Sequence, residues 1–567
     1  MPSADYGVSF TEWPDRVRPR KFGGATISTT YFVKINDKKF GPFDAAKLKH
    51  LAGAGKVSPD DAVSRDGETS WVKASNVKGL FPEPSNNADA PPEPPNDRQS
   101  RLQSLWRAAS SATDLGFLTR RRRIAITGLA GTGKTVFLTT LINHLKHHDP
   151  SGFHLFDDKT DVEVKQFAEV EMNEGLREFG HSVYAKAMQT GRWPHKTVDV
   201  SAYACRFNTD RHWVEHRVEF LDWPGERVAD VVMCKRSYAD WSDRLVEYWE
   251  VSDSNYQRHV APYLAALQHK ALSEKSILAE YRLALGRLVL DNNPLISPSC
   301  YLVGRDGNRP GGSSPEQLAD RGVVGVNADS QFAPLSNEAR RRLPELAGRF
   351  TQRYDEYRTQ VVDGLFDSLK RCNRLIVLVD IPAILASGPN RLNDNHEMVD
   401  ELLNRLDASA SKAKGIIKGL YNALAPAELM WTGIEKIAFV ATKADVVGGQ
   451  ENRDNLLKLL KEMLRDIVSR VEGVEMGFFV ASPVNSTQHP ADGSFLIGKP
   501  MFDEQGMRLP ADAPERSYPV SEVPEKWPEC WSCGEYSFPD VYPALPKGRF
   551  MLPKHIGLDK VFRFVLE

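Results

Sequence analysis

The chain contains 567 residues, and because one hydrophobic core rarely grows beyond about 250–300 residues, two or more folded units are expected. Apolar residues make up 41% and charged residues 26%, an ordinary composition for a globular protein. Lys and Arg total 73 against 75 Asp and Glu, so the overall charge gives no reason to expect a nucleic acid as partner.

The composition is typical of a cytoplasmic protein. Six cysteines are too few for a disulfide framework in a chain of this length. Met1–Phe10 has no basic start followed by an apolar run, and no window holds ~18 uninterrupted apolar residues, so we expect neither a secretory signal nor a membrane-spanning helix. The basic run Arg120–Arg123 leaves peripheral contact with a membrane open, beside the simpler interpretation as a solvated face.

The N-terminal region divides by composition into four segments. Residues 1–30 are mixed in character and are expected to be flexible. Residues 31–81 are predicted to form a compact unit, because Tyr31–Ile35 alternates like a strand and turn residues follow it. Residues 82–97 are rich in proline, as in a semi-rigid linker, and 98–119 have the apolar periodicity of an amphipathic helix.

From residue 124 onward, strand-like and helical patterns alternate, which is typical of an α/β protein. The first strand is expected at Arg123–Thr127 and the first helix at Val136–Lys146. Val198–Phe207 and His216–Leu221 alternate like the two strands of a hairpin. Residues 228–371 are long and helix-rich, and they are predicted to form a helical insertion.

Three continuous apolar runs follow, at Leu375–Val379, Ile437–Ala441 and Phe478–Ala481. Such runs favour strands of a parallel sheet that is buried on both faces. Leu558–Leu566 is expected to be a closing helix. The predicted fold class is therefore α/β, with a three-layer, G-domain-like arrangement of sheet and helices.

The strongest motif is Gly-Leu-Ala-Gly-Thr-Gly-Lys-Thr at 128–135, which fits the phosphate-binding P-loop at every fixed position. Glycines let the backbone curl so that its N–H groups face phosphate oxygens, and the following helix adds its positive end. Lys134 is predicted to bridge the terminal phosphates as a catalytic residue, and the Thr135 hydroxyl to bind Mg²⁺. The predicted phosphate-binding residues are Gly128, Ala130, Gly131, Thr132, Gly133, Lys134, Thr135 and Val136.

A second motif, Asp-Trp-Pro-Gly-Glu at 222–226, follows an apolar strand and fits the D-x-x-G element of GTPases. Asp222 is predicted to position Mg²⁺, and the Gly225 amide to sense the γ-phosphate. Glu226 is the candidate catalytic group that orients the attacking water, with a solvated surface carboxylate as the alternative. Thr197 is the candidate second metal ligand, and otherwise it is an ordinary strand residue.

Base selection is predicted at Thr-Lys-Ala-Asp, residues 442–445, which fits [NT]-K-x-D after an apolar strand. The Asp445 carboxylate can accept hydrogen bonds from both guanine N1–H and the exocyclic amine, which adenine lacks in that geometry. The stem of Lys443 can cover the base plane. Thr442 belongs to the same element, and Ala481 and Ser482 are predicted to support the base from a second loop.

Together these motifs resemble the YcjX-like P-loop family. The resemblance rests on the P-loop, on Trp193-Pro194, Asp222–Glu226, Leu378–Asp380 and Ala441–Asp445, and on the C-terminal stretch Pro553–Lys560. It extends over residues 98–567 and implies a cytosolic bacterial protein with a G-domain-like fold, large helical insertions and a stress-associated role.

Residues 31–81 resemble a second family, the bacterial GYF-like modules. The residues that carry the resemblance are Gly41-Pro42-Phe43, Leu48, Gly55-Lys56-Val57, Trp71-Val72 and Gly79-Leu80-Phe81. The resemblance implies binding of proline-rich peptides on an aromatic surface. Tyr31, Phe32, Phe43 and Trp71 are expected either to line such a groove or to form the core of this small unit.

The expected reaction is hydrolysis of GTP to GDP and phosphate with Mg²⁺ as cofactor, used as a slow conformational switch. Two alternatives remain open at this point. One is an ATPase of the same fold, in which 442–445 is only a turn. The other is a non-catalytic scaffold that nucleotide stabilises.

Overall fold

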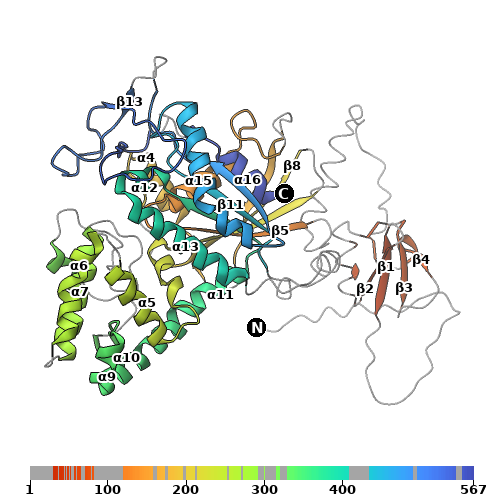
Figure 1. Ribbon diagram of the computed structural model, residues 1–567. Coiled ribbons are helices and arrows are strands. Elements are labelled where there is room, and N and C mark those ends of the chain that lie inside the picture. Colours follow the sequence, from red (N-terminus) through yellow and green to blue (C-terminus); the bar gives the residue numbers. More distant parts are fainter. Residues whose placement is uncertain are drawn as a thin grey trace, which may run out of the picture. The chain divides into compact units, whose positions relative to one another are not determined.

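In the computed structural model the chain forms two compact units, Met1–Thr119 and Arg120–Glu567 (Figure 1). Among the helices of the described residues, none has the length and apolar content needed to cross a membrane. The structure describes residues 30–35, 38–43, 45, 48–49, 52, 57–58, 60–65, 71–77, 80–81, 119–156, 162–172, 176–195, 199–210, 214–251, 255–269, 273–290, 299, 314–319, 328–407, 433–489, 495–544 and 552–567.

The N-terminal unit contains a small antiparallel sheet in the order β2-β1-β3-β4. Its strands are β1 (Tyr31–Ile35), β2 (Lys38–Phe43), β3 (Ala62–Arg65) and β4 (Val72–Lys73). The strand predicted from alternation at Tyr31–Ile35 is confirmed. Tyr31 belongs to the buried core, whereas Phe32, Phe43 and Trp71 are only half-buried. The linker predicted at 82–97 and residues 98–118 of the predicted amphipathic helix lie outside the described residues.

The C-terminal unit is built on a mixed eight-stranded sheet among the described residues, in the order β12-β11-β10-β5-β9-β8-β6, with β7 beside β8. Parallel pairing joins β5, β10, β11 and β12, and antiparallel pairing joins β8 to β9 and β6. The predicted hairpin and the three predicted parallel strands are therefore confirmed. The strands are β5 (Thr119–Gly128), β6 (Val164–Glu169), β7 (Arg177–Glu178), β8 (Ser201–Thr209), β9 (Glu215–Asp222), β10 (Arg374–Val379), β11 (Lys436–Ala441) and β12 (Glu475–Val480).

Strand β5 begins four residues earlier than its apolar run predicts, because the arginines before that run find partners in the fold. Arg122 Nε donates to the Leu566 carbonyl at 3.1 Å, near the end of the chain. Arg123 lies 3.7 Å from Glu219 on the neighbouring strand. These contacts hold Arg122 and Arg123 in the strand, whereas Arg120 is exposed to solvent.

Alternating side chains of the central strands enter two separate hydrophobic cores, one on each face of the sheet. In β10, Leu375 and Val377 face one core, while Ile376 and Leu378 face the other. Successive strand residues point to opposite faces, so both faces of the sheet are apolar and helices pack on each of them. The unit therefore has three layers, with the sheet between two layers of helices. Helices α3 (Lys134–Lys146) and α16 (Leu558–Leu566) cover the second face; α12 (Ile381–Ser387), α13 (Pro389–Asp407) and α15 (Gln450–Arg470) cover the first.

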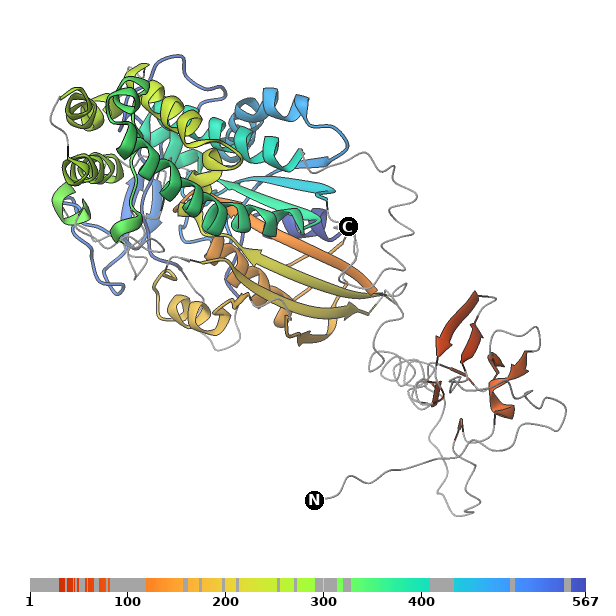
Figure 2. The same cartoon turned by 90° about the horizontal axis from the view of Figure 1, so that it is seen from below.

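Between β9 and β10 the chain forms a helical insertion, which the sequence predicts at about residues 228–371. Both views place its helices together to one side of the sheet (Figure 1, Figure 2). Packed aromatic rings, among them Tyr238, Trp241 and Tyr354, form much of its core. Its helices are η2 (Gly225–Met233), α5 (Tyr238–Val251), α6 (Asn255–Gln268), α7 (Glu274–Leu290), α8 (Pro315–Ala319), η4 (Ala328–Ser330), α9 (Asn337–Arg342), α10 (Pro344–Tyr357), η5 (Arg358–Asp363) and α11 (Gly364–Lys370).

After β12 comes a segment with one small hairpin among its described residues, formed by β13 (Phe495–Gly498) and β14 (Arg516–Pro519). Two stacked tryptophans attach it to the helices. The Trp527 indole donates to the Leu459 carbonyl of α15, and the Trp531 indole to the Leu385 carbonyl of α12. This segment therefore packs on the two helices that follow β10 and β11.

Candidate functional site

The loop between β5 and α3 encloses a buried lysine. Gly131 and Gly133 adopt φ of +86° and +88°, a left-handed conformation that side chains disfavour, so glycine is required at both turns. Lys134 opens α3, and its Nζ donates to the carbonyls of Gly128 at 2.8 Å and Leu129 at 2.9 Å. The loop thus holds a cation at the positive end of a helix, an arrangement suited to a phosphate.

The remaining predicted phosphate-binding residues occupy the rim and base of this loop. Thr132 is buried, and its Oγ1 donates to the Leu129 carbonyl at 2.9 Å, which fixes the turn. Gly131 is exposed, and Ala130 is half-buried. Val136 lies in the first turn of α3, where its backbone N–H belongs to the group that has no partner within the helix.

The segment after β9 meets this loop. Thr135 Oγ1 donates to Asp222 Oδ2 at 3.3 Å, and Asp222 is fully buried. A Cβ atom at Gly225 would lie only 2.3 Å from Lys134 Nζ and 2.8 Å from the Ala130 nitrogen. Gly225 is therefore in close contact with the phosphate loop, and no larger residue fits there without movement.

The hydroxyl of Thr135 and the carboxylate of Asp222 are the kinds of ligand that fit Mg²⁺. Magnesium prefers oxygen ligands and is usually held by one or two protein groups together with substrate phosphates. Within the part of the chain that the structure describes, no cluster of three His, Cys, Asp or Glu side chains could hold a metal by itself. A metal at Thr135 and Asp222 would therefore depend on phosphate oxygens for its other ligands.

The loop after β11 carries a buried carboxylate. Asp445 Oδ1 accepts from Ser482 Oγ at 2.7 Å, and Oδ2 accepts from the Ser486 backbone N–H at 3.0 Å. Burial raises the pKa of Asp445, and these two hydrogen bonds oppose the shift. A carboxylate offers about four acceptor positions, so the hydrogen bonds from Ser482 and Ser486 do not use its full capacity.

Lys443 pairs with a residue from a different loop. It has a φ of +58°, unusual for a non-glycine residue, and its Nζ lies 2.6 Å from Asp380 Oδ2. The Asp380 carboxylate raises the pKa of Lys443, although burial opposes this. Asp380 also accepts from the Ala383 N–H at 3.0 Å and so caps α12. The one sequence signal for this partner is an acidic residue between an apolar strand and a helix-starting proline.

The phosphate loop and the Asp445 loop start from the same edge of the sheet. In the parallel register, Gly128 of β5 lies opposite Leu378 of β10, and Val379 of β10 lies opposite Ala441 of β11. Two strand spacings separate β5 from β11 by about 10 Å. Strand β5 also has β9, β8 and β6 on one side and β10, β11 and β12 on the other, so the order of strands reverses there. Open α/β sheets bind ligands at such a point, beyond the carboxyl ends of the strands.

The model of the YcjX-like family, DUF463, matches residues 122–567. The chain belongs to this family. A model of GYF domain 2 matches residues 31–80, so both resemblances noted in the sequence are confirmed.

Two relatives cover most of the chain. The Ras-like GTPase YcjX of Escherichia coli (strain K12) is 24% identical over 470 residues, which is 79% of this chain and 95% of that protein. A protein with the same name from Shewanella oneidensis is 22% identical over 486 residues, 79% of this chain and 94% of its own length. Both relatives are described by name as Ras-like GTPases.

The structure describes some of the other predicted site residues of the YcjX-like unit fully and others only in part or not at all. Thr442 is buried, and both its N–H and its Oγ1 donate to the Val379 carbonyl. Ala481 is fully buried directly after β12. Thr197 lies outside the described residues, and of Glu226 only the backbone, in η2, is described.

A buried polar network that the motifs do not reveal follows Gly225. Arg227 donates to the Tyr357 hydroxyl at 3.1 Å, and that hydroxyl donates to Asp230 at 2.8 Å. Asp230 also accepts from the backbone and hydroxyl of Ser299, at 2.8 and 2.7 Å. Burial raises the pKa of Asp230, with Arg227 opposing it. The segment that contacts the phosphate loop is thereby fixed to α10.

Proposed function

We propose that this protein binds guanine nucleotide together with Mg²⁺ and hydrolyses GTP to GDP and phosphate as a slow conformational switch. The printed name Ras-like GTPase of both relatives supports this proposal. The observation that carries it is the arrangement around Asp445, because that arrangement concerns the choice of base.

Asp445 is buried, and the hydrogen bonds from Ser482 and Ser486 do not use the full acceptor capacity of its carboxylate. Guanine presents two adjacent donors, N1–H and the exocyclic amine, which a carboxylate can accept. Adenine would leave at least one buried acceptor without a donor, at a cost of about 1–3 kcal/mol for each. We propose that Lys443, which pairs with Asp380, covers the base plane with its stem.

In the proposed complex, the Lys134 ammonium exchanges the carbonyls of Gly128 and Leu129 for β- and γ-phosphate oxygens. Thr135 and Asp222 would hold Mg²⁺, which neutralises phosphate charge when bound. The Gly225 amide would contact the γ-phosphate, since Gly225 already lies against Lys134.

The remaining steps concern water and the switch. We propose that Glu226, next to Gly225, orients the attacking water, and that Thr197 supplies the second protein ligand to the metal. A carboxylate beside the γ-phosphate also repels its charge, so turnover should be slow.

Ala481 and Ser482 would support the base, Ser482 through its hydrogen bond to Asp445.

For the N-terminal unit, the GYF domain match is compatible with binding of a proline-rich peptide. Half-buried Phe32, Phe43 and Trp71 provide aromatic surface for such a ligand. We propose this peptide-binding role for residues 31–81 as a separate activity of the chain.

The decisive experiment compares GTP, ATP and xanthosine triphosphate binding in wild type and Asp445→Asn. Wild type should prefer GTP to ATP by at least about 100-fold. The asparagine side chain has an accepting carbonyl and a donating NH₂ group. Its carbonyl should accept from xanthine N1–H, and its NH₂ should donate to the carbonyl that xanthine has in place of the guanine amine. Asp445→Asn should therefore lose GTP affinity by a similar factor and gain affinity for the xanthine nucleotide.

Asp454→Asn is the matched control, because Asp454 is exposed on α15, where it accepts from Gln450. It should leave all three affinities unchanged. Tight ATP binding that Asp445→Asn does not alter would refute guanine selection. Tight GTP binding by wild type without release of phosphate would refute hydrolysis and support a nucleotide-stabilised scaffold.

A further inference from the structure

The segment 495–544, which carries β13 and β14, packs against the residues that hold Asp445. Ser486 donates its N–H to Asp445, and the Ser486 carbonyl oxygen lies 3.5 Å from the position that a Cβ atom on Gly498 would take. Val541 covers the same glycine, since its Cγ1 lies 2.8 Å from that position. The stretch around Val541 is therefore separated from the proposed base site by a single glycine.

Hydrogen bonds fix the backbone around Val541 from two directions. Within the segment, the Met501 N–H donates to the Asp540 carbonyl at 2.9 Å. From the loop that follows α4 (His181–Gln189), the Trp193 indole donates to the Val541 carbonyl at 2.8 Å. These contacts give the backbone of Asp540 a defined place beside the proposed base site.

The order of the strands indicates where the sugar of a bound nucleotide would lie. Strand β10 lies between β5, which leads into the phosphate loop, and β11, which leads into the Asp445 loop. A nucleotide that joins the two loops must pass its ribose across the end of β10, where Asp380 directly follows Val379. Lys443 reaches the same point, because its Nζ lies 2.6 Å from Asp380. A side chain that faces Lys443 and Asp380 therefore faces the proposed ribose position.

The carboxylate of Asp540 lies near both of these charged groups. Desolvation by the surrounding protein raises the pKa of Asp540, the charge of Lys443 opposes the shift, and that of Asp380 adds to it. Direct electrostatic effects of this kind require short distances. Since Asp540 is also exposed, its carboxylate borders a part of the site that solvent reaches.

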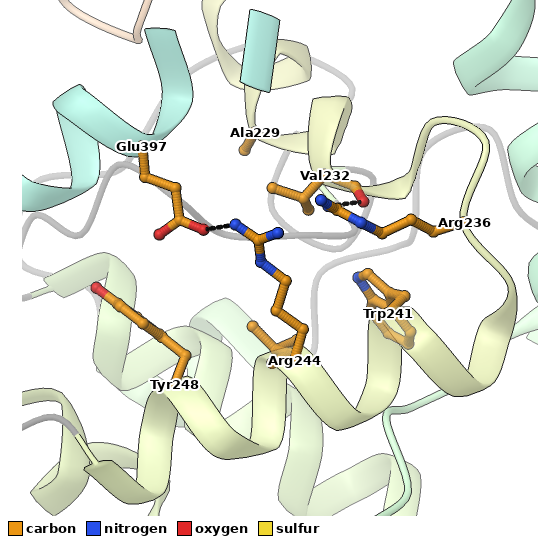
Figure 3. Close-up of a pocket in the computed structure, with 8 residues that line it drawn as sticks. Ala229, Val232, Arg236, Trp241, Arg244, Tyr248 and Glu397 are labelled. Atoms are coloured by element: carbon orange, nitrogen blue, oxygen red, sulfur yellow. Dashed lines mark hydrogen bonds and ion pairs between the residues drawn. The ribbon is translucent and has the colours of Figure 1, made fainter. Parts of the chain in front are cut away.

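The Asp540 carboxylate is available to a ligand. Asp380 already accepts from the Ala383 N–H and pairs with Lys443. Elsewhere in this unit opposite charges meet, as where Arg244 of α5 contacts Glu397 of α13 (Figure 3). Among the residues that the structure describes, the Asp540 carboxylate has neither a hydrogen bond nor an ion pair.

We propose that Asp540 recognises the ribose of the bound nucleotide by accepting hydrogen bonds from its 2′- and 3′-hydroxyl groups. This role rests on the proposed nucleotide binding and adds a specificity-determining residue to it. Hydrogen bonds to an ionised acceptor are stronger than those between neutral groups, and a carboxylate binds a ribose hydroxyl in the same way in dinucleotide-binding folds. Trp193, which holds the Val541 carbonyl, is a positioning residue for this carboxylate.

The test compares the binding of GDP and 2′,3′-dideoxy-GDP to the full chain with Mg²⁺ by isothermal titration. Wild type should bind GDP at least about tenfold more tightly, because hydrogen bonds to a charged group contribute more than neutral ones. Asp540→Ala should bind the two nucleotides equally and should retain the wild-type affinity for the dideoxy form. Equal binding by wild type, or a preference for GDP that persists in Asp540→Ala, overturns the proposal.

Further variants separate recognition from folding. Asp540→Asn keeps the shape and one accepting oxygen without the charge, so its preference for GDP should be intermediate. An undiminished preference in Asp540→Asn overturns the proposal. Asp512→Ala is the matched control, because Asp512 is an exposed carboxylate of the same segment, and it should keep the full preference. Circular dichroism and the thermal midpoint confirm that each variant is folded.

Trp193→Phe tests the positioning role. The variant removes the donor to the Val541 carbonyl but leaves Asp540 in place, so the preference for GDP over the dideoxy form should narrow. A loss of stability alone would lower the affinities for both nucleotides equally and leave their ratio unchanged. An unchanged ratio therefore overturns the positioning role of Trp193.

Failure of this proposal is distinguishable from failure of the proposed function. Wild type that binds GDP without preferring it to the dideoxy form refutes only the role of Asp540. Wild type that binds no guanine nucleotide refutes the proposed function, and the same comparison with ADP and 2′,3′-dideoxy-ADP then decides the role of Asp540. Absence of binding to both purine nucleotides overturns the two proposals together.

Discussion

The two halves of the candidate nucleotide site are constructed differently. The phosphate half is local, because β5, two left-handed glycines and the start of α3 place Lys134 within a single short segment. The base half is assembled from distant segments. Asp445 is held by Ser482 and Ser486, and Lys443 is held by Asp380, 63 positions earlier.

This difference explains why one half is easy to recognise in a sequence and the other is not. A backbone cradle needs glycines and a helix start at fixed spacing, so its chemistry is visible in eight residues. A base-selecting carboxylate works only if buried donors keep it oriented and leave two acceptor positions open. Here those donors are Ser482 and Ser486, which follow β12, the strand that pairs with β11.

The largest effect is expected in the phosphate half. Lys134→Ala removes a buried cation, so affinities for GTP and GDP should both fall by at least about 100-fold. Isothermal titration with each nucleotide measures this. Lys146→Ala is the control, because Lys146 lies on the same helix but pairs with Glu169 in an exposed position. A loss smaller than about threefold in Lys134→Ala would contradict the assignment.

Gly225→Ala tests the contact between η2 and the phosphate loop. A methyl group there would lie 2.3 Å from Lys134 Nζ and 2.8 Å from the Ala130 nitrogen, so the two segments must separate. Affinity for GTP should fall about tenfold or more, and affinity for GDP should fall less, because only GTP has the γ-phosphate. Gly348→Ala on α10 is the control, since nothing lies within 4 Å of its added Cβ. Equal loss for both nucleotides would exclude a specific γ-phosphate contact.

A smaller effect is expected in the base half. Ser482→Ala removes a donor from Asp445, so GTP affinity should fall about fivefold. That hydrogen bond lowers the pKa of Asp445, so its loss raises the pKa further and favours the protonated form. The defect should therefore be larger at about pH 6 than at about pH 8. Ser469→Ala, an exposed serine on α15, is the control. A defect independent of pH would argue against this role of Ser482.

The smallest effect concerns stability behind the phosphate loop. Burial lowers the pKa of His144 on α3 to about 3, so the folded protein holds this ring neutral. The unfolded chain then binds more protons below about pH 6.5, and folded stability falls as pH decreases from there towards the folded pKa.

His144→Leu should remove part of that loss. The thermal midpoint of wild type should drop by a few degrees between about pH 7 and pH 5, and the variant should drop less. Burial also lowers the pKa of His181, to about 4, so some acid sensitivity should remain in His144→Leu. Equal acid sensitivity of the two proteins would show that His144 does not contribute.

Much of the fold could be predicted from periodicity. The three apolar runs correspond to β10, β11 and β12, and the predicted hairpin corresponds to β8 and β9. The closing helix occupies Leu558–Leu566 as expected. Boundaries were less predictable. Strand β5 begins at Thr119 because Arg122 and Arg123 find partners in distant segments, and α3 begins at Lys134, two residues before its apolar pattern.

The sequence by itself determined the phosphate loop, the order of strands and helices and the families that the chain resembles, because glycine placement and apolar periodicity are local properties. Only the tertiary structure decided what surrounds Asp445, what pairs with Lys443 and how η2 is joined to α10 through Tyr357. Those relations join residues tens to more than a hundred positions apart. Local preferences carry no information about such contacts, which depend on how packed helices and strands bring distant polar groups together.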